Sequence, residues 1–554
     1  MPGKAPTRDM GRYAAALWLA LAAHRCLAQT PPTSNPPSYR IAGRIVSAAD
    51  GRPLPGAKVL LQNDQLAALA TSVADEQGRF AFSNVTAGLH PLQGEAPGYV
   101  TAAYLAHGIW STAIITGAGV DTESLLFKLA PLATLSGRVT DEAGDPVRNA
   151  AIALYQEDRN PGLSFVNHAG SAQTNDHGEY EFGQLTPGRY FVSASGTPWY
   201  AVHPQPAPPR QYPAGIVDSV DPALNVAYPI TFYPGVAEAA AAAPVTLRGG
   251  EVAVADIHLY PLPAMTITIQ RPPGDKNNQI PQLQQSAFTG LEHVNAEVLP
   301  SPTAYTISGV APGQYSLTLT AAQPGEPARA ATIDLTRGNT QLDAEFGEKL
   351  AQVRVLLKAA DGAKFPPQTR VDLIPSTLVT SLQVFANEKG EAQFDGVRPG
   401  VYTLDAIAVG QHNYYVTGLS VGGEYAKDKQ LHVATAAMLS VTLTVQRGNF
   451  RVEGYARRDS NPVVGAMVLL ADPNELGNLH FDGWRDQTNL DGSFQLNEIP
   501  PGKYVLLAID DGWDLAWRNH DVLARYLPLA VPVVVPESGD PSIRLADPLL
   551  VQPR

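Results

Sequence analysis

The chain has 554 residues, of which 44% are hydrophobic, and its formal net charge is −13. The hydrophobic fraction excludes a wholly disordered chain, and the length exceeds what one hydrophobic core organises. An acidic surface without a Lys/Arg stripe excludes nucleic acid as a partner, because it repels phosphate groups. The 48 glycines and 48 prolines are spread along the chain, which predicts many turns between short strands and therefore an all-β protein.

The first 28 residues have the parts of a secretory signal peptide. Basic residues come first, at Lys4, Arg8 and Arg12, and an apolar stretch follows at 14–23. This stretch is too short to span a bilayer, and it lacks the amphipathic stripe that a buried helix would need. A lipid anchor at Cys26 is disfavoured because His24 and Arg25 precede it. We predict a signal peptide at 1–28, a Pro-rich spacer at 29–38 and no transmembrane segment in the mature chain.

A repeat then organises the rest of the chain. Each copy has a polar turn ending in Gly, an alternating pair of aromatic or apolar residues, and a turn, usually Pro-Gly, followed by Tyr or Leu. The copies span 75–89, 175–190, 305–315, 387–402 and 489–504. Their spacing is that of whole β-sandwiches, because solenoid repeats are only 20 to 50 residues long. We predict modules at 39–130, 131–262 with a long loop insertion, 263–347, 348–447, and 448–554 with a short helix and a C-terminal tail.

The repeat has a physical explanation. Glycine at the end of the polar turn supplies the positive φ that a hairpin requires. The alternation that follows sends every second side chain into a core. Pro-Gly fits a type II turn, in which glycine again takes a positive φ. Each copy therefore predicts strand, turn, strand, turn, strand.

An upstream element completes the pattern. Copies one, two and five share a Gly-Arg-Val-like strand followed by a Pro-x-x-Gly-Ala-x-Val-like segment, at 41–60, 135–154 and 452–470. The complete pattern resembles the carboxypeptidase regulatory-like domain, a transthyretin-like and carbohydrate-binding-like fold of bacterial envelope proteins. Copies three and four match it only in their second half. The resemblance implies tandem Greek-key, prealbumin-like β-sandwich modules joined by short linkers, and it implies accessory, receptor-linked or stand-alone secreted roles.

The sequence contains no local motif for catalysis. None of the 12 histidines has Glu three residues later, as a zinc carboxypeptidase would require, and nucleotide-binding and serine-hydrolase motifs are absent. His177 and Glu179 come nearest, in a predicted hairpin turn. The Asp/Asn turns offer too few oxygens for calcium. We predict no catalytic residue, no metal and no cofactor, while a site assembled from distant carboxylates stays open.

Two aromatic groups are candidate ligand-binding sites. The insertion at 195–245 contains Trp199, Tyr200 and Tyr233, which can stack on a sugar or anchor a protein. The last module contains Trp484, Trp513 and Trp517, and the spacing at 513–526 predicts a short amphipathic helix. The alternatives are a loop packed over its own sandwich and a helix that fills the core.

These observations predict an extracytoplasmic protein, located in the periplasm, on the outer surface or in the medium. We expect a non-enzymatic binding or structural protein whose partner is a polysaccharide or an envelope protein. The family resemblance implies the carbohydrate ligand. The alternatives are a protein-interaction spacer or adhesion module, and an accessory to a hydrolase or a cryptic hydrolase.

Overall fold

The computed structural model describes residues 37–159, 162–204, 221–271, 281–319, 328–366, 368–376, 381–407, 413–427, 429–474 and 483–554. The predicted signal peptide and most of the spacer lie outside these residues. In the described part of the chain, strands hydrogen-bond within five groups, called modules 1 to 5 below. The module limits expected from the repeat stay predictions.

Modules 1 and 2 contain the first twenty strands. Module 1 has β1 (Tyr39–Ser47), β2 (Lys58–Gln62), β3 (Ala68–Val73), β4 (Arg79–Val85), β5 (Gly88–His90), β6 (Leu92–Glu95), β7 (Ala102–Ala103), β8 (Ile114–Thr116) and β9 (Leu125–Leu129). Module 2 has β10 (Ala133–Thr140), β11 (Ala151–Asp158), β12 (Phe165–Gln173), β13 (Glu179–Leu185), β14 (Gly188–Ser195), β15 (Val226–Ala227), β16 (Thr231–Phe232), the 3-10 turn η1 (Ala239–Ala241), β17 (Val245–Leu247), β18 (Val252–Val254), β19 (Ile257–His258) and β20 (Leu262–Pro263).

Modules 3 to 5 also consist mainly of short strands. Module 3 has β21 (Met265–Gln270), β22 (Gln282–Ala287), β23 (Gly290–His293), β24 (Glu297–Pro300), β25 (Ala304–Val310), β26 (Gln314–Leu319), β27 (Arg329–Asp334), β28 (Thr340–Leu342) and β29 (Glu348–Lys349). Module 4 has β30 (Ala351–Ala359), β31 (Arg370–Pro375), β32 (Leu382–Phe385), β33 (Glu391–Val397), β34 (Gly400–Ile407), β35 (Asn413–Val421), β36 (Glu424–Tyr425), β37 (Gln430–Val433) and β38 (Met438–Gln446). Module 5 has β39 (Phe450–Arg458), β40 (Asn461–Pro462), β41 (Met467–Ala471), β42 (Trp484–Gln487), β43 (Ser493–Ile499), β44 (Gly502–Ile509), η2 (Gly512–Asp514), α1 (His520–Leu523), η3 (Leu527–Leu529), β45 (Val531–Val535), β46 (Ser542–Arg544) and β47 (Leu549–Gln552).

The modules share one topology. The first strand of each (β1, β10, β21, β30 and β39) pairs antiparallel with the strand after the polar turn (β4, β13, β25, β33 and β43). On its other side it pairs parallel with a late strand (β9, β18, β28, β38 and β46). A second sheet packs on this layer, and in modules 4 and 5 the strands β35 and β47 join the two layers. The prediction of tandem β-sandwich modules is confirmed.

Each module has its own hydrophobic core. In module 1, Phe80 and Phe82 on β4 are buried while Ala81 between them is exposed, as the alternating pattern predicts. Modules 3 and 4, whose sequences match only half of the pattern, also enclose cores, centred on Ile307 and Phe394. The half-matched copies are therefore separately packed sandwiches.

The polar turns have the predicted geometry. Gly78, Gly178, Gly390 and Gly492 all have φ between 72° and 79°. A Cβ at Gly78 would lie 2.5 Å from the carbonyl oxygen of Ile45, so glycine is required for space as well as for φ.

The type II assignment of the later turn is wrong for three modules. Gly188, Gly313 and Gly502 do not have the positive φ that this turn needs. Positive φ occurs a few residues earlier instead, beside a register shift in the strand after the polar turn. The residues are Asn84, Gln184, Gly309, Gly396 and Glu498, with φ from 58° to 75°. A β-bulge therefore recurs in every module.

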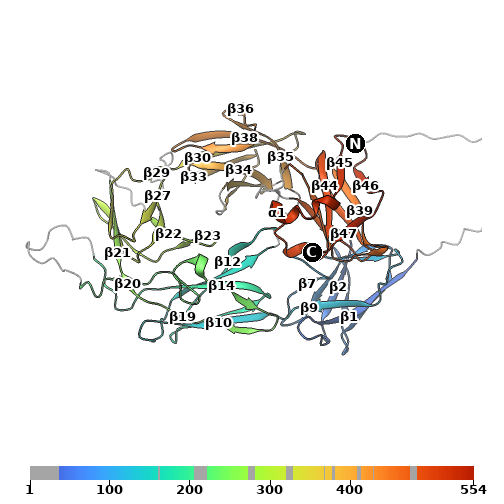
Figure 1. The fold of residues 1–554 in the computed structure, drawn as a ribbon, viewed down its shortest axis with the longest axis horizontal. Helices are drawn as coiled ribbons and strands as arrows, with labels where there is room; N and C mark the ends of the chain where they lie inside the picture. Colours follow the sequence, from blue (N-terminus) through green and yellow to red (C-terminus); the bar gives the residue numbers. More distant parts are fainter. Residues whose placement is uncertain are drawn as a thin grey trace, which may run out of the picture.

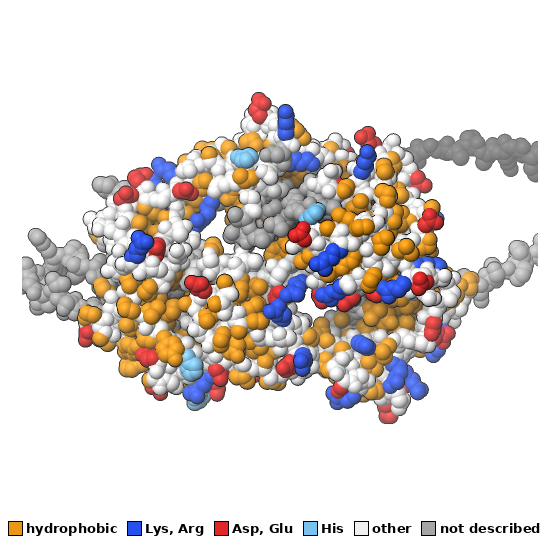
Figure 2. Space-filling model, in the orientation of Figure 1, with side chains coloured by type: hydrophobic (Ala, Val, Ile, Leu, Met, Phe, Trp, Pro, Cys, Tyr) orange, Lys and Arg blue, Asp and Glu red, His pale blue; other side chains and the backbone are white. Residues whose placement is uncertain are grey.

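The modules do not extend as a straight string. Module 5, at the red end of the chain, lies against modules 1 and 2 (Figure 1). The chain thus curls into a closed arrangement in which the first and last modules touch. Figure 2 shows the same face, with apolar surface over modules 2 and 5 and scattered charges of both signs. In the described part of the chain, no helix has the length and apolarity required to cross a bilayer.

Candidate functional site: an exposed aromatic pair and the joint between the first and last modules

Trp199 and Tyr200 lie on the surface of module 2, after β14. The Trp199 side chain is 88% exposed, and its ring contacts the Tyr200 ring edge-on with centroids 5.7 Å apart. The Tyr200 hydroxyl donates to Glu142 Oε1 (2.5 Å), and the Tyr228 hydroxyl donates to Glu142 Oε2 (3.1 Å). The structure therefore presents a free indole face beside a carboxylate that two tyrosines hold in place.

The two tyrosines and the carboxylate shift each other's titration. Burial and the neighbouring Glu142 raise the pKa of Tyr200 to about 12. Burial acts to raise the pKa of Glu142, but the hydroxyl donors outweigh it and hold this pKa below its usual value. Glu142 is therefore an ionised acceptor at neutral pH.

Tyr233 has a different environment from Trp199. Its ring packs against the core of module 2, and its backbone amide donates to Val192 O (2.9 Å). The adjacent Phe232 is 1% exposed and lies with Tyr155 and Phe288 in a cluster that joins modules 2 and 3. In the described part of the insertion, Tyr233 therefore packs on its own sandwich, and Phe232 on β16 packs between modules 2 and 3.

Trp484 is partly buried at the start of β42. Its ring packs against Tyr504 in an edge-on contact of 5.5 Å, at the core of module 5. The Tyr504 hydroxyl donates to the carbonyl of Pro500, four residues earlier (2.9 Å). Tyr190, Tyr315 and Tyr402 make the same bond in their modules, so Trp484 packs beside a recurring structural tyrosine.

Trp513 and Trp517 are not exposed, which corrects the expected aromatic face at these residues. Trp513 is 3% exposed, donates to Gly465 O (3.0 Å) and stacks on His107 of module 1, with rings 5.3 Å apart and 7° from parallel. Trp517 is 1% exposed and packs on Gly162 of module 2. Their apolar rings are covered because three modules meet there.

The predicted helix at 513–526 is also different in detail. The segment forms η2, α1 and η3, three short helical pieces; Leu515 and Asn519 between the first two are extended, and 524–526 between the last two form a turn. Leu523 and Tyr526 are buried with Trp513 and Trp517. The alternative of a core-filling segment is therefore what the structure contains.

Gln487 forms the polar centre of the contact between modules 1 and 5. Its side chain is buried, and its Nε2 donates to Leu105 O (2.6 Å) and to Thr112 Oγ1 (2.9 Å). Its Oε1 lies 2.9 Å from His107 Nδ1. Because Oε1 can only accept, the His107 tautomer that carries hydrogen on Nδ1 fits this contact. One side chain thus satisfies three groups of the neighbouring module.

Backbone groups extend the contact on one side of Gln487. Thr112 Oγ1 donates to Thr488 O (3.0 Å), and Ala113 N donates to Asn489 Oδ1 (3.1 Å). Leu490 N donates in return to Ala113 O (3.1 Å). On the other side, Trp110 Nε1 donates to Arg485 O (3.0 Å). We call residues 105–113 and 485–490 together the clasp.

Comparison with known proteins identifies part of the chain. The sequence model of the carboxypeptidase regulatory-like domain matches residues 40–122 and 134–204. These two segments are similar in sequence to carboxypeptidase regulatory-like domains. The family resemblance read from the repeat is thereby confirmed in modules 1 and 2. No curated protein matches the sequence.

The solved structures similar to this chain include bacterial proteins named as pilins. The TIE protein of Bacillus anthracis is 11% identical, covers 76% of both chains and has a TM-score of 0.18. The minor pilin GBS52 of Streptococcus agalactiae is 13% identical over 41% of this chain and 97% of its own, with a TM-score of 0.21. A streptococcal ancillary pilin is 10% identical over 52% and 100%, with a TM-score of 0.20.

The polar turns of the repeat contain a signal for the clasp that sequence reasoning missed. The second residue of the polar turn is acidic in three copies, as Glu76, Asp176 and Glu388, but it is Leu490 in module 5. An apolar residue at the tip of a solvated turn has no partner within its own module. The structure packs Leu490 against the core of module 1.

The asparagine of that turn also has a different hydrogen-bond partner in module 5. In modules 2 and 4 the Oδ1 atoms of Asn175 and Asn387 each accept two amides of their own turn. In module 5, Asn489 Oδ1 accepts from Ala113 of module 1, and Asp491 accepts from Ser493 N instead. Asp491 therefore holds the turn closed, which leaves Asn489 available for the clasp.

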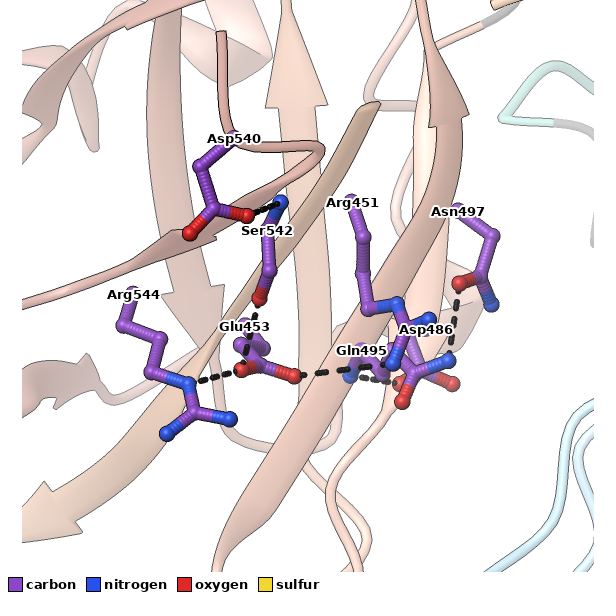
Figure 3. A network of polar contacts seen from close by, with 8 residues as sticks. All are labelled: Arg451, Glu453, Asp486, Gln495, Asn497, Asp540, Ser542 and Arg544. Atoms are coloured by element: carbon purple, nitrogen blue, oxygen red, sulfur yellow. Dashed lines mark hydrogen bonds and ion pairs between the residues drawn. The ribbon is translucent and has the colours of Figure 1, made fainter. Parts of the chain in front are cut away.

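A polar network on β39, β42, β43 and β46 includes Asp486 of the clasp (Figure 3). Asp486 accepts from the backbone amides of Gln487 (2.8 Å) and Gln495 (2.6 Å). Desolvation by burial outweighs these bonds and raises the pKa of Asp486 to about 6. Nearby, Glu453 binds Ser542 and Arg544. Within the described residues, no group of histidine, cysteine and acidic side chains is arranged to hold a metal.

Proposed function

We propose that this protein is an extracytoplasmic, non-enzymatic binding protein of the cell envelope that holds carbohydrate at Trp199. The observation that carries the proposal is the 88% exposed Trp199, whose indole contacts Tyr200 edge-on, while the Tyr200 hydroxyl donates to Glu142. The signal-peptide pattern at 1–28 supports the location. Trp484, Trp513, Trp517 and Tyr233 have packing partners of their own, so Trp199 and Tyr200 are the site residues that we retain.

The chemistry of the pair suits a sugar. One face of a pyranose consists of C–H groups that can lie on an indole, and burying that face removes apolar surface from water. The ionised Glu142 keeps lone pairs beyond those used by the two tyrosines, so it can accept from a sugar hydroxyl. A flat platform with one acceptor suits a chain of sugars better than a deeply enclosed small molecule.

Glycan-array screening followed by calorimetry tests this proposal. Trp199→Ala should weaken binding to the best glycan by about tenfold or more, because truncation of an anchoring indole costs more than about 1 kcal/mol. Tyr425→Ala is the matched control, since Tyr425 is a 61% exposed aromatic on module 4. Equal affinity of the Trp199 variant and the control would contradict a sugar site at Trp199.

A second candidate is a structural spacer that displays the modules to a protein partner. The contacts that join module 5 to modules 1 and 2 favour it, because they fix the relative positions of distant modules. Pull-down from envelope extracts tests this candidate. Silence on all glycans together with one specific protein partner would favour the spacer over the sugar-binding function.

A further inference from the structure

The clasp joins two segments that are far apart in the chain. Its hydrogen bonds link residues 375 to 382 positions apart. Consecutive modules are also tethered by the backbone, as Leu129 of β9 is to Ala133 of β10. The clasp has no such tether and consists of hydrogen bonds and packing. It can therefore open without breaking the chain.

The two halves of the clasp are specific for each other. Among the turns of modules 1, 2, 4 and 5, only that of module 5 combines an apolar tip, Leu490, with an asparagine whose Oδ1 accepts from another module. The receiving segment is equally specific, because Trp110 and Thr112 supply donors that match Arg485 O and Thr488 O. The complementary surface for module 5 is thus module 1 of this chain or of an identical chain.

We propose that the clasp also forms between two copies of this chain, which exchange module 5 and produce a swapped dimer. Exchange of an identical element between protomers recreates each native contact, so it costs little apart from lost freedom. The link at 447–449 between β38 and β39 contains Gly448 and is the hinge on which module 5 would turn. Closure within one chain dominates in dilute solution, and exchange increases with concentration.

Cysteine pairing tests the exchange directly in a Cys26→Ser background. A Cβ placed on Gly465 of module 5 lies 3.9 Å from Thr112 Oγ1 of module 1, so a small backbone shift brings cysteines at the two positions to disulfide geometry. Gly465 has a φ of 79°, and the stability of each single-cysteine chain is therefore measured before mixing. Chains carrying Thr112→Cys and chains carrying Gly465→Cys are mixed, unfolded, refolded together at increasing concentration and oxidised. We expect disulfide-linked heterodimers whose yield rises with concentration. A chain carrying both cysteines should form the intrachain disulfide in dilute solution.

Leu490→Glu provides the second variant, because it restores the acidic residue that other modules carry at this turn. Module 5 should therefore still fold. The clasp loses its apolar anchor both within one chain and between two chains. Adding this change to the Gly465→Cys chain should reduce the heterodimer yield about tenfold. Intrachain disulfides without heterodimers at any concentration would overturn the exchange, and so would heterodimers that Leu490→Glu leaves unchanged. Glycan binding at Trp199 is measured separately and does not bear on this result.

Discussion

At the residue scale, Gly162 shows how a missing side chain permits an intermodule contact. Its φ is 83°, and a Cβ there would lie 2.3 Å from Trp517 Cε2. Arg518 N donates to Gly162 O (3.1 Å) at the same place. Trp517 could be recognised from the sequence as an aromatic that needs a partner. Its partner could not, because glycine is common in loops for the backbone conformation alone and gives no sign that a ring packs on it.

Gly162→Ala should destabilise the protein by about 1–3 kcal/mol more than Gly144→Ala does. Both glycines have similar positive φ, 83° and 86°, so the backbone strain of alanine is shared. Only Gly162 faces a neighbour, since nothing lies within 4 Å of a Cβ at Gly144. Equilibrium denaturation followed by tryptophan fluorescence measures the difference. Equal losses for both variants would mean that Trp517 moves aside without cost.

At the element scale, the sequence predicts turns better than bulges. The glycines of the polar turns predict a positive φ, because few other residue types adopt it. The bulges place Gln184 and Glu498 in the same backbone region, and these residue types rarely adopt it, so they give no such signal. The expected helix at 513–526 had suitable spacing, but packing among three modules broke it into short turns. Local patterns therefore predicted the sandwich and not its irregular parts.

The stability of the folded protein should depend on pH through Asp486, whose carboxylate accepts from backbone amides of β42 and β43. Its pKa is raised from 3.8 to about 6 in the folded protein. The folded state therefore holds the proton more tightly, and its stability falls as pH rises from 4 to 6, by at most about 3 kcal/mol. Asp486→Asn cannot ionise and is the control. The unfolding free energy of the wild type minus that of the variant should fall, by at most about 3 kcal/mol, between pH 4 and 7; a constant difference would contradict the assignment.

At the scale of the whole molecule, the sequence predicts the modules and not their closure. Repeat length and core pattern define each sandwich locally, whereas the clasp joins residues 375 or more positions apart. The predicted site residues differ in the same respect: some depend on one module and others on the contact between modules. Exposure of Trp199 belongs to one module, and burial of Trp513 depends on His107 of another. Leu490 is the residue in the sequence that indicates the clasp, because it is apolar where Glu76, Asp176 and Glu388 are acidic.

Gln487→Ala should loosen the closed arrangement. It leaves the groups of Leu105, Thr112 and His107 without their partner, which costs about 2–4 kcal/mol of the contact. Gln173→Ala is the control, because Gln173 occupies the same repeat position in module 2 and is exposed there. Small-angle scattering should give a larger radius of gyration for the first variant only. An unchanged radius for both would show that the aromatic contacts suffice to keep the ends together.

Closure also changes how such a chain is expected to unfold. In a linear array, a terminal module has one neighbour and an interior module has two, so the end modules gain least from contacts between modules. Here module 5 rests on modules 1 and 2, so the first and last repeats cap each other. Heating should therefore melt the end modules together with the interior ones, and a chain with an opened clasp should instead lose its outermost repeats first.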